Sequence, residues 1–468
     1  MKNSLLFFLA AIFAFPAILS ADSIRVTNYA DGETISYPVA LIYGTLENPD
    51  AAEIVCENIS SRKASRVIPG DAFRGRFKVL AELVPGENHL VLKSGEAEFR
   101  LMLQYAKNEN PTYVRIIYMT DSGGGTEFQT PVENDPQDFR GKLDTAMKIM
   151  QTFTAERMHD LGFGRKTFNL ELDENGDVRV HVFRGKRPAE EYYALDDGAW
   201  YDAVYNEIKE EFPMDAARNL VIPAYTRFDP ATKKDLAHTA LGGGGGLALF
   251  GSGNLFTWPD SLAEVVPAFR NTTPIDGNQV KDDSVGRSNF WGAASTTIGA
   301  ALHELGHTFF LPHTNHEQDI MTRGFDRFNR VFLVREAPHA YNPEFIDFPE
   351  DEIAMFAPIS AYPLACGPWF AQDDPEKRPK TEVKMEMNHE TGIITLTAES
   401  GLYYIGCFVH DERKWFWGLP FGEEAPGTFS FQFHDMKNVA ENGRRYEFMA
   451  CDVYGNATYM AVLVNGGE

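Results

Sequence analysis

The sequence is poor in cysteine and, after its N-terminus, contains no apolar stretch long enough to cross a membrane. Only four cysteines occur among 468 residues, and their spacing does not match a zinc-thiolate site. Cys407 and Cys451 fall within one predicted β-rich domain, so we expect that these two could form a disulfide. Cys56 and Cys366 fall in different domains, and each of the four can also be a buried thiol that packs as a small apolar side chain.

Basic residues are also scarce. Lys and Arg number 43 against 67 Asp and Glu, so the net charge is −24, and no basic cluster stands out. The sequence therefore predicts no nucleic-acid partner. Hydrophobic residues make up 44% of the chain, which excludes a long disordered protein, and 468 residues are too many for one ordinary core. We expect about two to four domains.

The N-terminus has the composition of a secretion signal. Lys2 supplies positive charge, residues 5–19 form an apolar run broken only by Pro16, and Ser20 and Ala21 offer small side chains at a cleavage point. Residues 1–21 are therefore predicted to be a signal peptide, which implies a secreted or extracytoplasmic (periplasmic or extracellular) location. The run is shorter than a bilayer-spanning helix needs, so we expect no stable membrane insertion; an uncleaved anchor is the alternative.

The rest of the chain divides into three regions by its hydrophobic pattern. Residues 22–107 alternate apolar and polar positions in short runs, which predicts a β-sandwich similar to the immunoglobulin-like modules of many secreted enzymes. Residues 378–468 alternate in the same way and predict a second sandwich. Residues 111–365 mix strands with helices, so we expect a multidomain protein with an α+β domain flanked by two all-β sandwich domains.

Apolar periodicity places particular elements inside the α+β region. Five glycines, 242–246, have no phosphate-binding arrangement around them and predict a flexible approach to an edge strand; an ordinary core hairpin is the alternative. The expected strands are 113–119, 219–225, 247–250 and 254–258, and the expected helices are 139–161, 200–212 and 325–333.

The segment HELGH carries the clearest chemistry. His303 and His307 are four residues apart, so on a helix they lie on one side and can bind the same metal ion. Apolar residues recur at helical spacing through 298–305, which places the motif on an amphipathic helix. Glu304 directly follows the first histidine and can take a proton from a water on that metal.

A third histidine follows the first by ten residues. His313 comes after a Leu-Pro step that must leave the helix, so the chain can turn and bring a third imidazole to the ion. Three protein ligands and one open position are what a catalytic zinc needs. His316, Glu317 or a distant carboxylate are the alternative third ligands.

The pattern HExxHxxxxxH resembles the metzincin signature HExxHxxGxxH, and Asp319-Ile320-Met321 resembles the Met-turn of that clan. The runs HELGHTFFLPHT, DIMTRGFDRFNRVF and GGGGGLALFGSGNLFTWP are similar to a family of zinc metallopeptidases known mainly from fungi and other eukaryotes. This resemblance covers about residues 110–360.

The resemblance implies a metzincin-like zincin fold for residues 111–365, with Zn²⁺ as the cofactor. It implies that His303, His307 and His313 hold the zinc and that Met321 lies beneath it. It also implies that an edge strand just before the active-site helix binds the substrate backbone as an added strand.

The sequence departs from the metzincin pattern at two places. Phe310 replaces the signature's glycine, and since a phenylalanine with positive φ would be strained, we expect the turn to use another geometry. Metzincins of the astacin type often have a tyrosine just after the methionine, whereas Arg323 and Asp326 occupy this region here. Tyr341 and His339 are the candidates for a second donor to the oxyanion.

We therefore expect a secreted zinc-dependent metalloendopeptidase in which Glu304 is the general base, acting on a protein or peptide substrate. The alternative is a secreted binding or adhesion protein whose zincin domain is structural or inactive. Three protein ligands with an open position favour the enzyme, whereas a fourth protein ligand favours the binding protein. The sequence makes no prediction of oligomeric state.

Overall fold

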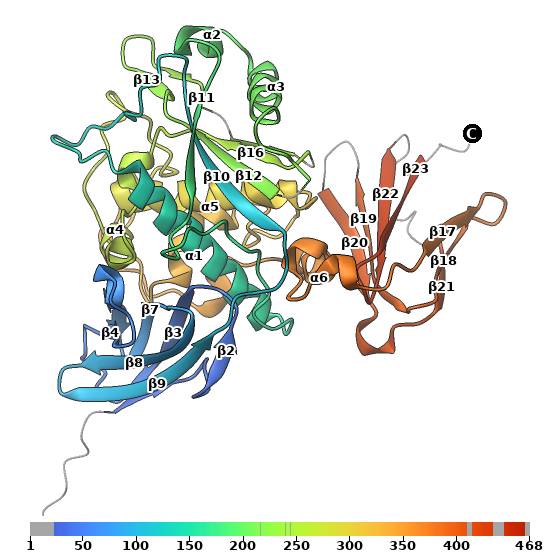
Figure 1. Ribbon diagram of the computed structural model, residues 1–468, viewed down its shortest axis with the longest axis horizontal. Coiled ribbons are helices and arrows are strands. Elements are labelled where there is room, and N and C mark those ends of the chain that lie inside the picture. Colours follow the sequence, from blue (N-terminus) through green and yellow to red (C-terminus); the bar gives the residue numbers. More distant parts are fainter. Residues whose placement is uncertain are drawn as a thin grey trace, which may run out of the picture.

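The chain is a multidomain α+β protein in which a central part of mixed strands and helices carries β-sheets on two sides (Figure 1). The computed structural model describes residues 23–215, 217–238, 240–243, 245–409, 414–433 and 444–463. The predicted signal peptide at 1–21 lies outside the described residues. Within them, no helix has the length and apolar character needed to cross a membrane.

Two sheets near the N-terminus enclose one hydrophobic core. The first has the order β1 (Ile24–Val26), β3 (Val39–Leu46), β7 (Arg76–Glu82), β6 (Asp71–Phe73). The second has the order β2 (Glu33–Ile35), β9 (Ala97–Tyr105), β8 (Gly86–Ser94), β4 (Val55–Asn58), β5 (Val67–Pro69). Ile42 and Phe77 of the first sheet share a buried cluster with Leu92 and Leu103 of the second, because alternate residues of each strand face the same side.

The central sheet has the order β11 (Val180–Arg184), β10 (Tyr113–Thr120), β12 (Ala217–Pro223), β16 (Leu247–Phe250), β15 (Ala240–Gly243). The first four strands run parallel, and β15 is an antiparallel edge strand. The strand expected at 247–250 is therefore present but interior, and the edge strand precedes it. The strand expected at 254–258 is wrong. Its residues form the 3₁₀ helix η2 (Leu255–Thr257), because both the N–H and the hydroxyl of Thr257 bond to the carbonyl of Asn254, at 2.9 and 2.8 Å.

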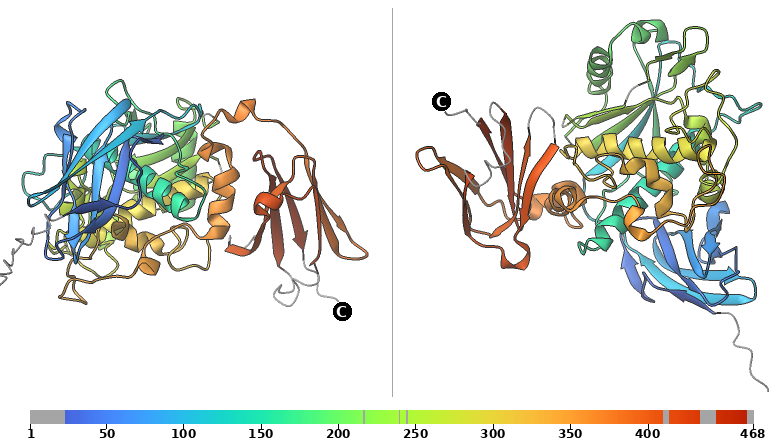
Figure 2. Two further views of the ribbon diagram at one scale, coloured as in Figure 1. Left: turned by 90° about the horizontal axis from the view of Figure 1, so that it is seen from below. Right: turned by 180° about the vertical axis from the view of Figure 1, so that it is seen from behind.

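Helices cover both faces of the central sheet (Figure 2). Ile116 of β10 packs in one cluster with residues of α1 (Phe139–Asp160) and α5 (Phe290–Thr308). Its neighbour Ile117 packs on the opposite face with residues of α2 (Ala189–Tyr193) and α3 (Asp197–Ile208). The helix expected at 139–161 is confirmed. The helix expected at 325–333 is wrong, since this segment is a 3₁₀ helix with a kink at Arg327.

The remaining short elements lie between the longer strands and helices along the chain. They are η1 (Ala64–Arg66), β13 (Arg227–Asp229), β14 (Lys234–Leu236), η3 (Leu262–Glu264), α4 (Val265–Ala268), η4 (Gly324–Val331), η5 (Glu350–Glu352), α6 (Pro358–Cys366), η6 (Pro368–Phe370), η7 (Pro375–Lys377) and η8 (Gly422–Glu424).

Two further sheets follow α6 (Figure 2). One has the order β17 (Val383–Asn388), β18 (Ile393–Ala398), β21 (Thr428–Gln432), and the other β20 (Lys414–Pro420), β19 (Leu402–Val409), β22 (Arg445–Asp452), β23 (Ala457–Leu463). Leu396 of the first sheet shares a buried cluster with Ile405 and Phe448 of the second.

The expected disulfide between Cys407 and Cys451 is wrong. Cys407 pairs with Phe448 across β19 and β22, so Cys451 lies three residues further along its strand. Three residues of a β-strand span about 10 Å, whereas bridged cysteines have Cα atoms within about 7 Å. The thiol of Cys451 lies instead beside that of Cys366, at the end of α6.

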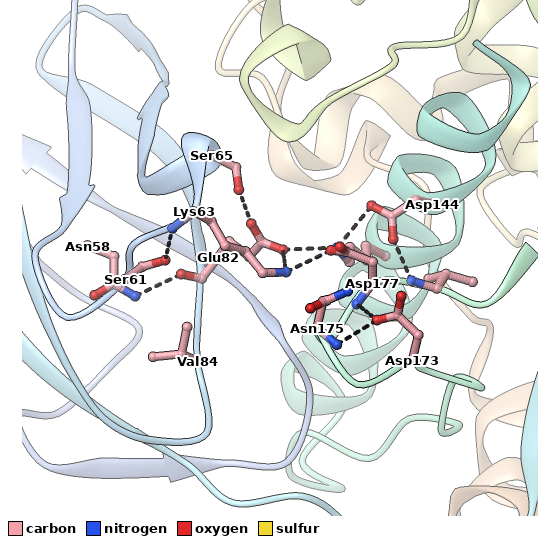
Figure 3. A network of polar contacts seen from close by, with 12 residues as sticks. Asn58, Ser61, Lys63, Ser65, Glu82, Val84, Asp144, Asp173, Asn175 and Asp177 are labelled. Carbon is pink, nitrogen blue, oxygen red and sulfur yellow. Dashed lines mark hydrogen bonds and ion pairs between the residues drawn. The ribbon is translucent and has the colours of Figure 1, made fainter.

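A buried ionic network joins the N-terminal sheets to α1 (Figure 3). The ammonium of Lys148 lies 2.9 Å from carboxylate oxygens of both Glu82 on β7 and Asp144 on α1. Lys63 lies 3.0 Å from the same Glu82 and 2.7 Å from Asp177. Burial alone would lower the pKa of Lys148, but Asp144 and Glu82 outweigh burial and raise it. The network therefore stays charged and fixes the N-terminal sheets against the central part.

Lys148→Met is expected to lower the free energy of unfolding by about 3–5 kcal/mol, because it removes the buried cation that the buried Glu82 and the half-buried Asp144 share. Urea denaturation followed by circular dichroism measures this loss. Lys93→Met, at an exposed position of β8, is the matched control and is expected to change stability by less than about 0.5 kcal/mol. Equal effects of the two substitutions would contradict a stabilising role for the network.

Candidate metal centre

The HELGH motif lies in the last two turns of α5, as predicted. The helix begins at Asn289, whose side chain accepts the N–H of Gly292 at 2.9 Å and so caps the first turn. Most of the helix is buried beneath the central sheet, which is why its first turns are rich in small residues. His303 and Glu304 are only 6% and 7% exposed, so the motif sits inside the protein and not on a solvated face.

Three imidazoles converge at the end of α5. The Nε2 of His303 lies 3.1 Å from the Nε2 of His307 and 3.2 Å from the Nε2 of His313. Two nitrogens bound to a tetrahedral zinc at about 2.0–2.1 Å are roughly 3.3–3.4 Å apart, so these spacings are close to those of a zinc site. No other group of three or more His, Cys, Asp or Glu side chains in the described ranges is arranged to hold a metal.

Backbone carbonyls orient two of these rings. The carbonyl of Ile320 lies 2.7 Å from Nδ1 of His303, and that of Leu311 lies 2.7 Å from Nδ1 of His307. A carbonyl only accepts, so each Nδ1 carries the ring proton and each Nε2 keeps its lone pair for a metal. Burial, together with the neighbouring His307, lowers the pKa of His303 to about 3. Neutral imidazoles with converging lone pairs are the donor set that Zn²⁺ requires.

The turn after α5 brings the chain back toward the other two histidines. The N–H of Phe310 bonds to the carbonyl of His307 at 3.1 Å, and that of Leu311 to the carbonyl of Gly306 at 3.2 Å. These two bonds form a Schellman motif, which normally has glycine at its left-handed position. Phe310 has φ = +67°, so our expectation of another turn geometry is wrong.

Phe310 tolerates the left-handed position because its side chain leaves the turn. The ring is 61% exposed, and the guanidinium of Arg218 lies 5.5 Å from its centroid. The left-handed conformation costs a residue with a side chain roughly 1–2 kcal/mol, which the two hydrogen bonds of the motif offset. His313 therefore reaches the other histidines without the glycine of the metzincin signature.

A buried carboxylate ties the third histidine's loop to the methionine turn. Asp319 accepts the hydroxyl of Thr314, which follows the third histidine, at 2.8 Å and the N–H of Met321 at 3.0 Å. Met321 is fully buried and packs on Gly306, where a Cβ would lie 2.4 Å from its sulfur. This role of Asp319 could not be predicted from the sequence, because no sequence pattern shows which hydrogen-bond donors a buried carboxylate will meet.

Gly242 of the edge strand β15 crosses α5 directly above Glu304. A Cβ at Gly242 would lie 2.1 Å from the carbonyl oxygen of Glu304 and 2.9 Å from Cβ of His307, so only glycine permits this approach. Burial raises the pKa of Glu304 to about 8, although a hydrogen bond from the N–H of Gly242 acts in the opposite direction. A bound dication would favour the ionised carboxylate. The glycine run that suggested flexibility thus includes a position of close packing.

The alternative ligands and oxyanion donors lie elsewhere. His316 and Glu317 are exposed and outside the histidine cluster. The ring of His339 lies 5.9 Å from that of Trp291, at the start of α5. The helix rises about 18 Å over the twelve residues from Trp291 to His303, so His339 lies near the opposite end of α5 from the three histidines. Tyr341 is 77% exposed and lies near His339.

A cavity of about 410 Å³ lies against β15 and the middle of α5, and none of the three converging histidines is among the residues that line it. It is lined by Ala240 at the start of β15, by Ala300 on α5, and by Arg323, whose charge contributes to the low pKa of His303. Arg323 is paired with Asp326 at 2.9 Å. Arg323 is thus close enough to act on His303 electrostatically, whereas Asp326 contacts Arg323, Arg287, Ser295 and Thr296.

Related sequences occur in yeasts. A Schizosaccharomyces pombe protein named putative zinc metalloproteinase is 30% identical over 282 residues, which are 56% of this chain and 45% of that protein. A Saccharomyces cerevisiae protein of the same description is 26% identical over 362 residues, which are 68% of this chain and 50% of that protein. The chain thus spans about half the length of the curated relatives it matches.

Solved structures show a weaker likeness. Wild-type OgpA from Akkermansia muciniphila is 16% identical, covers 76% of this chain and 94% of its own, and has a TM-score of 0.45. Catalytically inactive OgpA in complex with an O-glycopeptide has the same identity and coverage and a TM-score of 0.46. Similarity at this level assigns neither a substrate nor a mechanism to this chain.

The family profile described as "Putative peptidase family" matches residues 23–403. The match covers most of the 468 residues and contains all the converging histidines. This agrees with the resemblance seen in the HELGH segment and its neighbours, and the chain therefore belongs to this family of putative zinc metallopeptidases.

Proposed function

We propose that this chain is a zinc-dependent metalloendopeptidase of the metzincin type, in which His303, His307 and His313 hold the metal. The observation that carries the proposal is the convergence of three imidazoles with no fourth ligand side chain among the residues that the structure describes. A structural zinc is closed by four protein ligands, whereas a catalytic zinc keeps one position open. This favours an enzyme over a binding or adhesion protein with a structural zincin domain.

Glu304 is the proposed general base. Bound zinc would supply a Lewis acid that polarises the scissile carbonyl and acidifies a neighbouring water. The Glu304 carboxylate would accept the proton of that water and pass it to the leaving amine. Its place directly after His303 on a buried helix, and the N–H of Gly242 bonded to it, support this role. Met321, packed under Gly306, is proposed to lie beneath the metal.

The substrate is proposed to be a protein or peptide that lies along β15. This strand pairs only with β16 in the described sheet, so its outer edge can accept an extended backbone as a further strand. The neighbouring cavity begins at Ala240 and would receive a substrate side chain. Its lining includes the ring of His238 and the carboxylate of Asp283, which lie 2.8 Å apart, so the cavity offers polar groups to a polar side chain.

The domain division and location are proposed from the sequence pattern. A secreted or extracytoplasmic protein would lose residues 1–21 and retain a β-sandwich at 22–107, a metallopeptidase domain at 111–365 and a β-sandwich at 378–468. N-terminal sequencing of the mature protein tests the cleavage point. A mature protein that still begins at Met1 would exclude the signal peptide.

The test of the activity is a peptide-library digest by the zinc-loaded protein, with products identified by mass spectrometry. We expect cleavage inside peptides, loss of cleavage with 1,10-phenanthroline and recovery when zinc is restored, because the open metal position is required. The His303→Ala, His307→Ala double variant, prepared in the same way, controls for contaminating proteases. A protein that binds one zinc per chain and cleaves no peptide would support the binding-protein alternative.

A further inference from the structure

Cys366 and Cys451 meet at the interface between α6 and the four-stranded C-terminal sheet. They are 85 residues apart in sequence, yet their Sγ atoms are 2.8 Å apart, and both side chains are buried. We propose that these two thiols are oxidised to a disulfide that joins the C-terminal sheet covalently to the central part of the protein. The other two cysteines, Cys56 and Cys407, are buried thiols that remain reduced.

The interface holds the two thiols in place through contacts that do not involve sulfur. The ring of Tyr362 on α6 stacks on that of Tyr404 on β19, with centroids 5.3 Å apart and planes 3° apart. At Gly455, in the turn after β22, a Cβ would lie 2.0 Å from the carbonyl oxygen of Cys366, so the turn packs directly on the end of α6. The approach of the thiols is thus a property of a packed interface and not of two mobile surface side chains.

The oxidation requires a disulfide-bearing oxidant, such as glutathione disulfide or a thiol–disulfide oxidoreductase. One cysteine, as the thiolate, attacks the oxidant's disulfide and releases one thiol; the second cysteine then attacks the mixed disulfide and releases the other. Two S–H bonds are lost and one S–S bond forms in this chain. The two electrons and two protons pass to the oxidant, which leaves as two thiols.

Burial makes this pair a structural link and not a rapid switch. A hydrogen bond with Cys366, together with burial, raises the pKa of the Cys451 thiol well above its ordinary value. Thiolate is therefore scarce in the folded protein, and thiol–disulfide exchange there is slow. We expect the bond to form while the chain folds, before α6 and the C-terminal sheet close over the two sulfurs.

The cysteine pair also lies across a cavity from the turn that follows α5. Cys366 and Cys451 line a cavity of about 220 Å³ together with Phe309, Phe310 and Trp369. The first two of these aromatic residues belong to the turn that returns the chain to the third histidine. The disulfide nevertheless stands apart from the proposed peptidase activity, since counting thiols requires no metal and no substrate.

The test counts thiols in protein produced through an oxidising secretory route and, separately, in reduced protein refolded with glutathione disulfide. Each sample is denatured and alkylated without reductant, and its intact mass is measured. We expect two labels per chain, on Cys56 and Cys407, and four labels after reduction. Peptide mapping without reductant should yield a linked pair that contains Cys366 and Cys451.

Variants separate this pairing from others. Cys366→Ala should leave three labelled thiols without reductant, whereas the matched control Cys407→Ala should leave one and retain the linked peptide. Four labelled thiols in the wild-type protein from both preparations, or a linked peptide that joins Cys451 to Cys407, would overturn the proposal. The wild-type map decides the question by itself if Cys366→Ala fails to fold. Reduction should also lower the unfolding midpoint of the wild-type protein by several degrees, and leave that of Cys366→Ala unchanged.

Discussion

Glu304→Gln is expected to keep one zinc per chain and to lose peptidase activity by about 10³–10⁴-fold. The amide has the shape of the carboxylate but cannot accept the proton of the attacking water, so transition-state stabilisation is lost while the fold and the three imidazoles remain. Metal content by mass spectrometry and kcat/KM on a peptide from the library digest measure the two effects.

Glu317→Gln is the matched control for this substitution. It makes the same chemical change at an exposed carboxylate just beyond the third histidine, outside the metal cluster. We expect its zinc content and its rate to equal those of the wild-type protein. A Glu304→Gln protein that cleaves at the wild-type rate would exclude Glu304 as the base, and one that has lost zinc would show that Glu304 supports the metal.

His313→Ala is expected to weaken zinc binding by at least about a hundredfold and to abolish cleavage. Its Nε2 lies 3.2 Å from that of His303, so its removal takes away one of the three converging donors. Losing an outer-shell partner alone typically costs about 10–100-fold in affinity, and losing a ligand costs more. Competition with a chromophoric chelator measures the affinity directly and needs no active enzyme.

His316→Ala tests the alternative ligand at the same time. His316 is exposed, so its removal should leave both zinc affinity and cleavage at wild-type values. The opposite pattern, with zinc lost in His316→Ala and kept in His313→Ala, would overturn the metzincin ligand set. The peptidase proposal would survive that result, because any third protein ligand leaves one position open.

Local pattern was enough to predict several elements. The strand at 113–119 is Tyr113–Thr120, because a short and nearly continuous apolar run is typical of a strand buried on both faces. The helix at 139–161 is Phe139–Asp160, because its apolar residues recur at helical spacing. The predicted end of a helix was less accurate where a capping side chain sets the first helical residue. The helix expected at 200–212 is Asp197–Ile208, since Asp196 accepts the N–H of Ala199 at 2.8 Å and starts the helix early.

Two predictions from the sequence were wrong because they depended on contacts between segments that are far apart in the chain. The pairing of β19 with β22 separates Cys407 from Cys451, and the packing of α6 brings Cys366 to the latter instead. The close crossing of β15 over α5 turns an apparently flexible glycine at 242 into a packing requirement. Neither contact produces a periodic pattern in the sequence, because each depends on where two elements meet in the folded chain.

The sequence by itself determined the chemistry of this protein: two histidines one helical turn apart, a carboxylate between them and a third histidine ten residues on. These spacings are local, so helix geometry alone brings the first two imidazoles together. Only the tertiary structure decided that the third one joins them. Phe310 holds a left-handed turn because its hydrogen bonds to the helix end and its exposed ring offset the strain, and Asp319 anchors the loop that follows. Both depend on partners whose positions the folded chain alone supplies.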